Sequence, residues 1–498
     1  MQSFAKLKEK LFIIFTMLTA LLLIPIIGSL IILPMNERKS LTYIKQIGLI
    51  TALINFVVSI VLWGEFDSSS LQYQFVQEFN TLDFCHLHIG VDGISLYFVL
   101  LTTFITPICL LSNWDNLKFG YKYYFIAFLL METMLIAVFV VLDLMLFYIF
   151  FEAVLIPMFL VVGIWGGSIT RIRAAFLLFL YTLAGSLFML LAIMVIYYNV
   201  GSTDFTIISL SEISFESQKI LWLAFFLAFA VKTPLWPFYM WLPRAHAEAP
   251  LRGSVLLAGL FLKLATYGYL RVLINFMPDA SNYFSPLVQT IAIITLIYAS
   301  LATIRQVDFK RLVAYSSIAH MAIVVLGLFS NTIIGIEGAI VLSIAHGFIS
   351  PALFVIVGGV LYDAHHTRII RYYRGLAVYA PVLGLLFFLR TIANMGIPLS
   401  LNWAGEFMGL SGIFQRSPII GVLASTGIVL SACYSIFLFN RLIFGRYSQY
   451  LGKSHDVSRR EFIILFTLIR PVFVLGIFPN VILNDLHVSV TSLLYVIS

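Results

Sequence analysis

The chain has 498 residues, of which 61% are hydrophobic and only 11% are charged, and its mean hydropathy is +1.02. These values exclude a soluble globular domain, in which about a quarter of the residues carry a charge. The apolar runs are about 20 residues long and unbroken, which excludes a β-barrel and predicts an all-α polytopic membrane protein. The first run, Leu11–Leu33, lacks a signal-peptide cleavage site, so we expect it to span the membrane.

Hydropathy predicts about fourteen membrane spans. They lie near residues 11–33, 47–64, 94–113, 123–141, 144–164, 174–198, 220–242, 254–276, 284–303, 311–329, 334–360, 380–412, 418–444 and 461–486. The longest runs exceed one straight crossing and contain Pro351 and Pro398, so we expect both helices to be interrupted. The segment Leu71–His88 is expected to lie on the membrane surface or to pair as short strands.

The predicted spans fall into two similar blocks, helices 4 to 8 and helices 9 to 13. An odd number of helices places the second block upside down relative to the first, and each block has a proline-interrupted helix in fourth position, helices 7 and 12. We therefore predict two inverted five-helix repeats. The expected parts are 1–122 with helices 1–3, 123–276 with the first repeat, 284–444 with the second repeat, and 445–498 with a loop and helix 14.

The basic residues predict the orientation. With fourteen spans, the loops after odd-numbered helices contain twenty of the 30 lysines and arginines, whereas the opposite face with both termini contains six. Lysine and arginine collect in loops that are not translocated. We therefore expect both termini on the outer, positive side of the membrane. The net charge of +7 reflects this topology and does not indicate a nucleic-acid partner.

Ionisable residues within the apolar segments form a series. Lys232 is followed directly by Pro234 and Pro237, which remove helical hydrogen bonds, and a charge beside a helix break at membrane depth is typical of an ion pathway. A charge at the bilayer centre costs about 2.5–3.5 kcal/mol on insertion scales, so each such residue suggests a function. The series consists of Glu132, Glu152, Lys232, Lys263, His320, His346 and Glu406. Joined by water, such groups could carry protons through hydrocarbon.

Each of these residues also has a structural interpretation. Glu132 could form an ion pair between helices, and His346 could be a packing residue. His320 and His346 could ligate a haem, although the second facing pair expected of a cytochrome is absent. Three scattered cysteines (Cys85, Cys109 and Cys433) form no CxxC pair, so we expect no iron–sulfur, zinc or other cofactor site in this chain.

Several motifs together resemble one family. They are Phe150-Phe151-Glu152-Ala153-Val154-Leu155-Ile156-Pro157-Met158, Ala230-Val231-Lys232-Thr233-Pro234, Trp241-Leu242-Pro243-Arg244-Ala245-His246-Ala247-Glu248-Ala249-Pro250, Leu262-Lys263-Leu264-Ala265-Thr266-Tyr267-Gly268, Ala314-Tyr315-Ser316-Ser317-Ile318-Ala319-His320-Met321 and Gly405-Glu406-Phe407, with Gly90-Val91-Asp92-Gly93-Ile94-Ser95. This set, which covers roughly residues 85 to 445, is similar to the subunit 4 family of respiratory complex I (NADH:ubiquinone oxidoreductase), mitochondrially encoded members above all. That family belongs to the Mrp-type antiporter-like proteins.

The resemblance implies roles for individual residues. Glu152 and Lys232 would form a modulating ion pair, Lys263 and His320 would continue a hydrophilic axis, and Glu406 would release the proton. Glu132, His346, His246 and Glu248 are additional candidates.

The resemblance also implies a location and partners. The chain would lie in the mitochondrial inner membrane with both termini in the intermembrane space, among neighbouring antiporter-like subunits and membrane lipids such as cardiolipin. It would be part of a proton-translocating NADH:ubiquinone reductase without doing redox chemistry itself. Flavin, iron–sulfur clusters and ubiquinone would bind to other subunits. An Mrp-type cation/proton antiporter and the membrane arm of a hydrogenase remain as alternatives.

Several positions depart from the family pattern: Leu251-Arg252, Arg374, Arg390, Arg470 and, in the turn after Pro398, Leu399-Ser400. Arg390 and Arg470 lie within predicted spans and have no evident acidic partner in the sequence, so each should be costly. One interpretation is that these arginines extend to the membrane surface or pair with lipid phosphate. The other is that a mitochondrial codon was translated with an unsuitable table.

Overall fold

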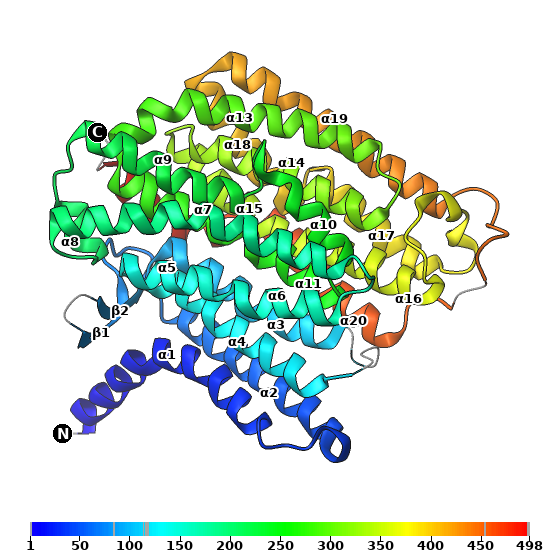
Figure 1. Cartoon of the computed structure of the whole chain (residues 1–498), viewed down its shortest axis with the longest axis horizontal. Helices are drawn as coiled ribbons and strands as arrows, with labels where there is room; N and C mark the ends of the chain where they lie inside the picture. The colour runs from blue at the N-terminus through cyan, green and yellow to red at the C-terminus, as the bar shows by residue number, and fades with distance from the viewer. Residues whose placement is uncertain (1, 83–84, 113, 115–118, 453–454, 496–498) are drawn as a thin grey trace.

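The computed structural model describes the backbone of residues 2–82, 85–112, 114, 119–452 and 455–495, and the side chains of these residues except 2–16, 80–86 and 495. Most helices run side by side along one direction of the molecule, and a small hairpin lies at one end (Figure 1). This is the helical membrane architecture that the composition predicts.

The helices of the first half of the chain are α1 (Gln2–Ile32), α2 (Glu37–Gly64), α3 (Gly93–Ser112), α4 (Tyr121–Val140), α5 (Leu144–Ala153), α6 (Leu155–Trp165), α7 (Arg171–Val200), α8 (Phe205–Leu210), α9 (Phe215–Lys232), η1 (Phe238–Met240), α10 (Trp241–Glu248), α11 (Leu251–Leu256), η2 (Leu257–Phe261), α12 (Leu262–Gly268) and η3 (Tyr269–Ile274). Those of the second half are α13 (Pro278–Ile304), α14 (Phe309–Leu328), α15 (Ile333–Phe354), η4 (Val355–Leu361), α16 (Tyr362–His365), η5 (Ile370–Tyr372), η6 (Leu376–Val378), α17 (Pro381–Asn394), α18 (Leu401–Arg416), α19 (Pro418–Ile443), α20 (Arg459–Ile477) and α21 (Asn480–Tyr495).

The polar segment between α2 and α3 forms an antiparallel hairpin of β1 (Gln74–Leu82) and β2 (Cys85–Val91). Glu78 pairs with His88 and Gln77 with Ile89. Of the two arrangements expected for residues 71–88, short paired strands are therefore the one that forms.

Ten helices of the described chain are long and apolar enough to cross a membrane, or eleven if the bent pair α20 and α21 counts as one span. Helices α10, α17 and α18 have fewer than 18 residues, and the 18-residue α9 carries three charged residues, so none of them is counted by this criterion. Met17–Ile32 and Pro381–Asn394 are shorter apolar helices. A count of fourteen spans in two inverted repeats therefore remains a prediction.

The predicted break in the seventh span is present. Helix α9 ends at Lys232, and helical structure resumes only at η1 and α10. The Leu235 backbone N–H donates to the carbonyl of Ala230 at 2.9 Å, which closes the end of α9. Proline cannot supply the next helical hydrogen bond, so the helix stops where the sequence predicts.

The break near Pro398 is also present. Helix α17 ends at Asn394 and α18 begins at Leu401. In the connecting turn Gly396 has a φ of 71° and Leu399 has a φ of 77°, which is the left-handed region. A leucine there is strained, because its Cβ crowds the backbone.

The expected interruption at Pro351 is wrong. The span from Ile333 to His365 is continuous, and Pro351 lies inside α15. The π-helical segment η4 follows directly, so i→i+5 bonding accommodates the local misfit. Gly259 faces the proline ring, where a Cβ would lie 3.2 Å from Pro351 Cγ, so the neighbouring helix leaves room for the ring.

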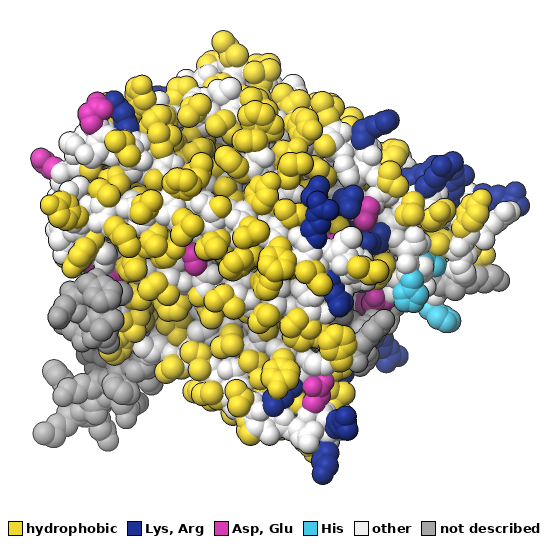
Figure 2. Space-filling model, viewed as in Figure 1, with side chains coloured by type: hydrophobic (Ala, Val, Ile, Leu, Met, Phe, Trp, Pro, Cys, Tyr) yellow, Lys and Arg dark blue, Asp and Glu magenta, His cyan; other side chains and the backbone are white. Residues whose placement is uncertain are grey.

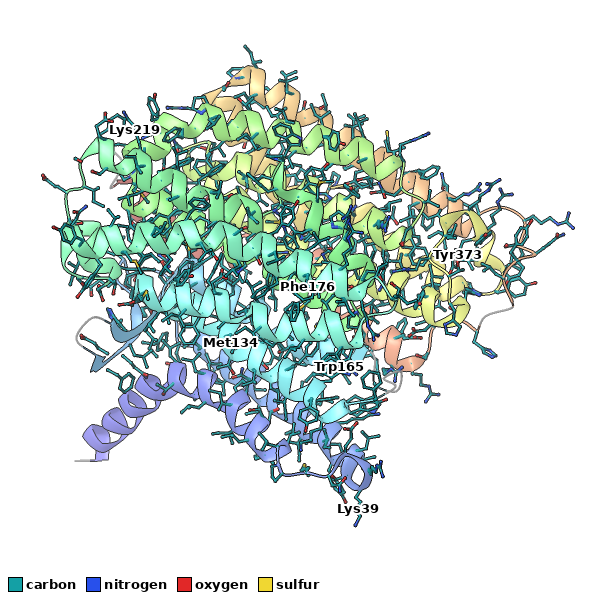
Figure 3. The ribbon with its side chains drawn as sticks, in the orientation of Figure 1. Lys39, Met134, Trp165, Phe176, Lys219 and Tyr373 are labelled. Carbon is teal, nitrogen blue, oxygen red and sulfur yellow. The ribbon has the colours of Figure 1, made fainter. Side chains whose placement is uncertain are left out.

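Charges are distributed unevenly between the two ends of the molecule. Figure 2 shows most Lys and Arg side chains at the end where α16 and α17 lie, and hydrophobic side chains across the middle. Lys219 and Tyr373 mark opposite ends in Figure 3, with Met134 and Phe176 between them. Both chain ends lie away from the basic end (Figure 1).

Glycines bring α15 and α18 close together. A Cβ added to Gly405 would lie 2.6 Å from the backbone nitrogen of Leu342, and one added to Gly338 would lie 2.4 Å from the nitrogen of Gly409. Small residues allow such close approach of helix backbones in membrane proteins. The packing holds Glu406, which follows Gly405, against the buried face of α15.

Candidate functional site

Lys232 lies at the end of α9 with 1% of its surface exposed. Its ammonium nitrogen donates to the carbonyl of Phe151 at 2.8 Å and lies 3.3 Å from the centre of the Phe151 ring. The Phe261 ring is 4.8 Å away on another helix. The helix break therefore places the ammonium between a carbonyl and two aromatic faces, which stabilise a cation without neutralising it.

Glu152 follows Phe151 in α5 and is half-buried. Its carboxylate and the Lys232 ammonium interact electrostatically, but the described residues include no direct ion pair between them. Contact through one water molecule stays a prediction.

Lys263 is fully buried in the seven-residue helix α12, between two π-helical segments. Its ammonium nitrogen donates to the carbonyl of Ala258 at 2.6 Å and lies 2.8 Å from Nδ1 of His346. The π-helical turn before Lys263 leaves backbone carbonyls available for such side-chain contacts. His346 is thus a direct partner of the lysine and not only a packing residue.

His346 leads to His320 and Glu406. The imidazole rings of His346 and His320 have their centres 6.0 Å apart, and both residues are 2% exposed. His320 Nδ1 lies 3.1 Å from Glu406 Oε1, and the Asn402 amide donates to the same oxygen at 2.9 Å. Tyr434 OH is 3.4 Å from the other nitrogen of His320. Helices α12, α15, α14 and α18 therefore contribute one continuous series, Lys263–His346–His320–Glu406.

Glu132 does not form the ion pair that its structural interpretation requires. The carboxylate is fully buried in α4 and accepts a 2.8 Å hydrogen bond from the Asn55 amide. No cation pairs with it among the described residues. An amide partner leaves the carboxylate able to bind a proton, so Glu132 remains a candidate outside the main series.

His246 and Glu248 lie in α10, at the basic end of the molecule. His246 is fully buried, stacks on Phe354 with ring centres 4.6 Å apart, and both of its nitrogens lack a hydrogen-bond partner among the described residues. Glu248 accepts from Ser168 and lies 3.8 Å from Arg368. Glu248 thus lies near solvent and His246 lies deeper.

Sequence reasoning missed several members of these networks. Lys310 and Arg271 are not in the series of ionisable residues predicted from the sequence, yet both are at least 95% buried. The Lys310 ammonium donates to the Ala249 carbonyl at 3.1 Å, and Arg271 forms an ion pair with Asp92. Asn402 could have been found, because it lies four residues before Glu406 on one helical face.

The four arginines that depart from the family pattern differ in their surroundings. Arg252 is buried and its guanidinium lies 5.1 and 5.2 Å from the ring centres of Tyr124 and Phe125. Arg390 is 1% exposed, and its three guanidinium nitrogens have no hydrogen-bond partner among the described residues. Arg374 and Arg470 are exposed. Arg390 is therefore enclosed by the protein, whereas Arg470 lies on the surface of the chain.

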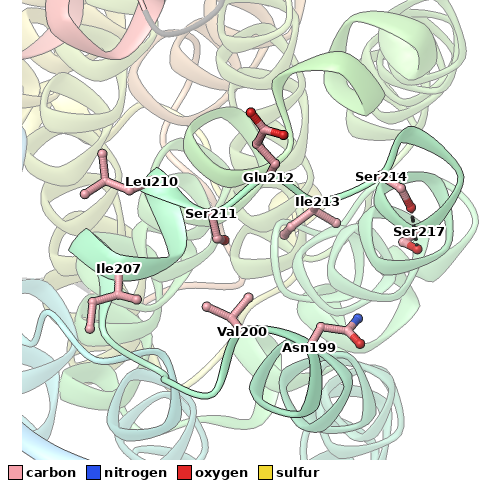
Figure 4. Close-up of a pocket in the computed structure, with 9 residues that line it drawn as sticks. All are labelled: Asn199, Val200, Ile207, Leu210, Ser211, Glu212, Ile213, Ser214 and Ser217. Carbon is pink, nitrogen blue, oxygen red and sulfur yellow. Dashed lines mark hydrogen bonds between the residues drawn. The ribbon is translucent and has the colours of Figure 1, made fainter.

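A surface cavity of ≈740 Å³ lies apart from this series, between the end of α7, helix α8 and the start of α9 (Figure 4). Glu212 and a Ser214–Ser217 hydrogen bond lie along its wall. No member of the buried series lines it. Among the described residues no group of three or more His, Cys, Asp or Glu side chains could hold a metal ion.

Known proteins share both sequence and structure with this chain. Residues 141–431 match the family described as NADH:quinone oxidoreductase/Mrp antiporter, TM. NADH-ubiquinone oxidoreductase chain 4 of Mycosarcoma maydis is 69% identical over 96% of this chain and 99% of that protein. The protein of the same name from Marchantia polymorpha is 48% identical over 96% of each chain. A chain of respiratory complex I from Thermus thermophilus with bound NADH superposes with a TM-score of 0.88 at 28% identity, over 97% of this chain and 100% of that one.

Proposed function

This chain belongs to the NADH:quinone oxidoreductase/Mrp antiporter family, and from that premise we propose that it is an antiporter-like, proton-translocating subunit of the membrane arm of respiratory complex I. It would couple NADH oxidation and ubiquinone reduction, which take place in other subunits, to proton movement across the membrane. We assign flavin and iron–sulfur clusters to those subunits, because the three cysteines of this chain are scattered.

The observation that carries the proposal is the contact series from Lys263 through His346 and His320 to Glu406. The Lys263 ammonium lies 2.8 Å from His346, and His320 lies 3.1 Å from the Glu406 carboxylate. The ring centres of His346 and His320 are 6.0 Å apart. Proton transfer needs donor and acceptor within hydrogen-bond reach or one water apart. The Lys263–His346 and His320–Glu406 contacts meet that condition, and transfer between the two imidazoles would need a bridging water. The four residues come from four helices of an apolar interior, where purely structural polar groups are costly.

Within this series we assign a direction. Lys232, held over Phe151, receives the proton and is influenced by the Glu152 carboxylate. The proton then moves through Lys263, His346 and His320 to Glu406. We place Glu406 at the outlet because it lies beside the helix break between α17 and α18. Glu406 is six residues beyond the end of that break, and a Cβ added to Gly396 within the break would lie 2.4 Å from the Glu406 carboxylate. We place uptake at the basic end, near His246.

We further propose that the protein is a multi-pass component of the mitochondrial inner membrane, with fourteen spans in two inverted repeats and its basic end in the matrix. Both termini would then face the intermembrane space, because they lie opposite the basic end. Neighbouring antiporter-like subunits and membrane lipids, cardiolipin included, are the expected partners.

The test is purification of the assembly that contains this chain, followed by reconstitution into liposomes. We expect co-purified flavin and iron–sulfur clusters, and proton pumping driven by NADH. Lys263→Ala should assemble and oxidise NADH, yet move fewer protons per electron. An assembly without flavin that exchanges cations for protons would instead support an Mrp-type antiporter.

A further inference from the structure

Six aromatic rings from five helices form a continuous layer, which we call the aromatic layer: Phe98, Phe139, Tyr267, Phe147, Phe151 and Phe229. Successive ring centres are 5.2, 5.3, 6.3, 5.6 and 5.9 Å apart. Each residue is at most 1% exposed. Rings at these separations are in van der Waals contact, so no water molecule fits between successive rings.

The layer lies on one side of the two buried lysines. Tyr267 is one helical turn beyond Lys263, in the direction of Arg271, which pairs with Asp92 next to the hairpin of β1 and β2. Phe229 is one turn before Lys232, and its ring packs against Tyr269, which also lies beyond Lys263. The Lys232 ammonium rests on the Phe151 ring at 3.3 Å. A proton on either lysine therefore meets aromatic rings in the direction of the hairpin, whereas Lys263 has an imidazole beside it.

A fixed positive charge lies immediately beyond the layer. The Arg271 guanidinium is 5.3 Å from the Tyr267 ring and forms an ion pair with Asp92, the residue after β2. It also donates to Tyr73 OH at 3.4 Å. Arg271 is 4% exposed. Arginine does not lose its proton, so it cannot relay one, and its charge repels any proton that approaches, as in pores that exclude protons.

We propose that the aromatic layer and the Arg271–Asp92 pair form a seal that prevents a proton on Lys232 or Lys263 from leaving directly towards the hairpin side. The rings exclude water, and the guanidinium opposes a cation. Transfer to His346, across the helices, is then the remaining exit from Lys263. This inference rests on the proposed function, because a seal matters only where protons are held against a gradient.

The test measures passive proton flux through the complete reconstituted complex without NADH, under an imposed pH gradient and with the membrane potential clamped. Tyr267→Ala and Phe139→Ala each open the layer without removing Arg271. We expect an increase in flux of about tenfold or more, because water in the gap lowers the barrier. Phe159→Ala is the matched control: its ring pairs with Phe176 at 5.3 Å outside the layer, and its flux should equal that of the wild type.

Two further variants separate a seal from general damage. Adding Lys263→Ala to Tyr267→Ala should return the flux to the wild-type level, because the leak passes over that lysine. Arg271→Gln removes the positive charge and should raise the flux about tenfold, whereas Arg271→Lys keeps the charge and should not. The reason is that a unit charge 5.3 Å from the ring opposes a proton even at an effective dielectric constant of about 20.

Assembled Tyr267→Ala and Phe139→Ala complexes that keep wild-type flux would overturn the proposal, as would a leak that persists in the double variant. If neither ring variant assembles, the contrast between Arg271→Gln and Arg271→Lys decides, and equal flux in the two counts against the seal. Failure of the proposed function appears elsewhere, as a normal proton-to-electron ratio in Lys263→Ala during NADH oxidation.

Discussion

Replacing Glu406 with glutamine tests the outlet of the buried series. The substitution keeps the side-chain volume and an oxygen that can accept from Asn402, but it removes the negative charge beside His320. The carboxylate oxygen lies 3.1 Å from His320 Nδ1, and both side chains are at most 3% exposed. At an effective dielectric constant of about 20, a charge pair at that distance is stabilised by about 5 kcal/mol.

Glu406→Gln therefore removes most of the stabilisation of a protonated His320. If half of that energy, about 2.5 kcal/mol, appears in the barrier for transfer onto the imidazole, the rate falls about 70-fold. We expect the variant to assemble and to oxidise NADH while the proton-to-electron ratio decreases. Glu406→Asp keeps the charge, moves it back by about one bond, and should retain much of the pumping.

The assay is reconstitution of the purified assembly into liposomes, with NADH oxidation followed by absorbance and proton uptake by a pH-sensitive dye. Assembly is checked by native electrophoresis before the ratio is compared. A Glu406→Gln complex that assembles and pumps at the wild-type ratio would refute the reasoning, because protons would then leave by a route that does not include this carboxylate.

Three other substitutions give independent checks. Lys263→Ala should lower the proton-to-electron ratio as Glu406→Gln does, because it removes the first member of the contact series; an unchanged ratio would remove the lysine from the path. Gly405→Ala should destabilise the assembly by about 1–3 kcal/mol, because the added methyl overpacks α18 on α15, and native gels should show less complex. Gly409→Ala is the control and should not destabilise the assembly, because a Cβ added there meets nothing within 4 Å. The hydrogen bond between His88 and Asp204 raises the pKa of His88 and, although burial opposes it, lowers the pKa of Asp204 to about 2. The His88–Asp204 hydrogen bond is fully formed near pH 6 and is lost as the pH rises through the raised pKa of His88. Amide exchange in β1 and β2, corrected for its intrinsic dependence on pH, should therefore become faster towards pH 8.5. In His88→Gln the corrected exchange should not depend on pH.

Local sequence was sufficient for two of the helix breaks and for part of the set of buried charges. Pro234 and Pro398 lack a donor that the backbone needs, so both helices stop near them. The same argument failed at Pro351, because a following π-helical turn and a facing glycine accommodate that ring. Sequence near a proline cannot indicate what a distant helix places opposite it.

The arrangement of the site depended on tertiary packing. His346 could not be assigned from the sequence beyond a packing residue, because its contact with Lys263 joins positions 83 residues apart. The close approach of Lys232 to the Phe151 carbonyl spans 81 residues in the same way. Asn402 was within reach of sequence reasoning, since its i, i+4 relation to Glu406 needs only a helix.

The helix-to-helix course of the buried series has an electrical consequence. Lys263, His346, His320 and Glu406 lie on four helices in contact with one another, so the proposed path leads a proton from helix to helix. Work against the transmembrane voltage, about 2.3 kcal/mol per charge per 100 mV, is done only by displacement along the membrane normal. A proposed transfer between helices at one depth would therefore be nearly free of electrical work. The voltage acts instead on the steps that bring a proton in from the basic end and release it on the other side.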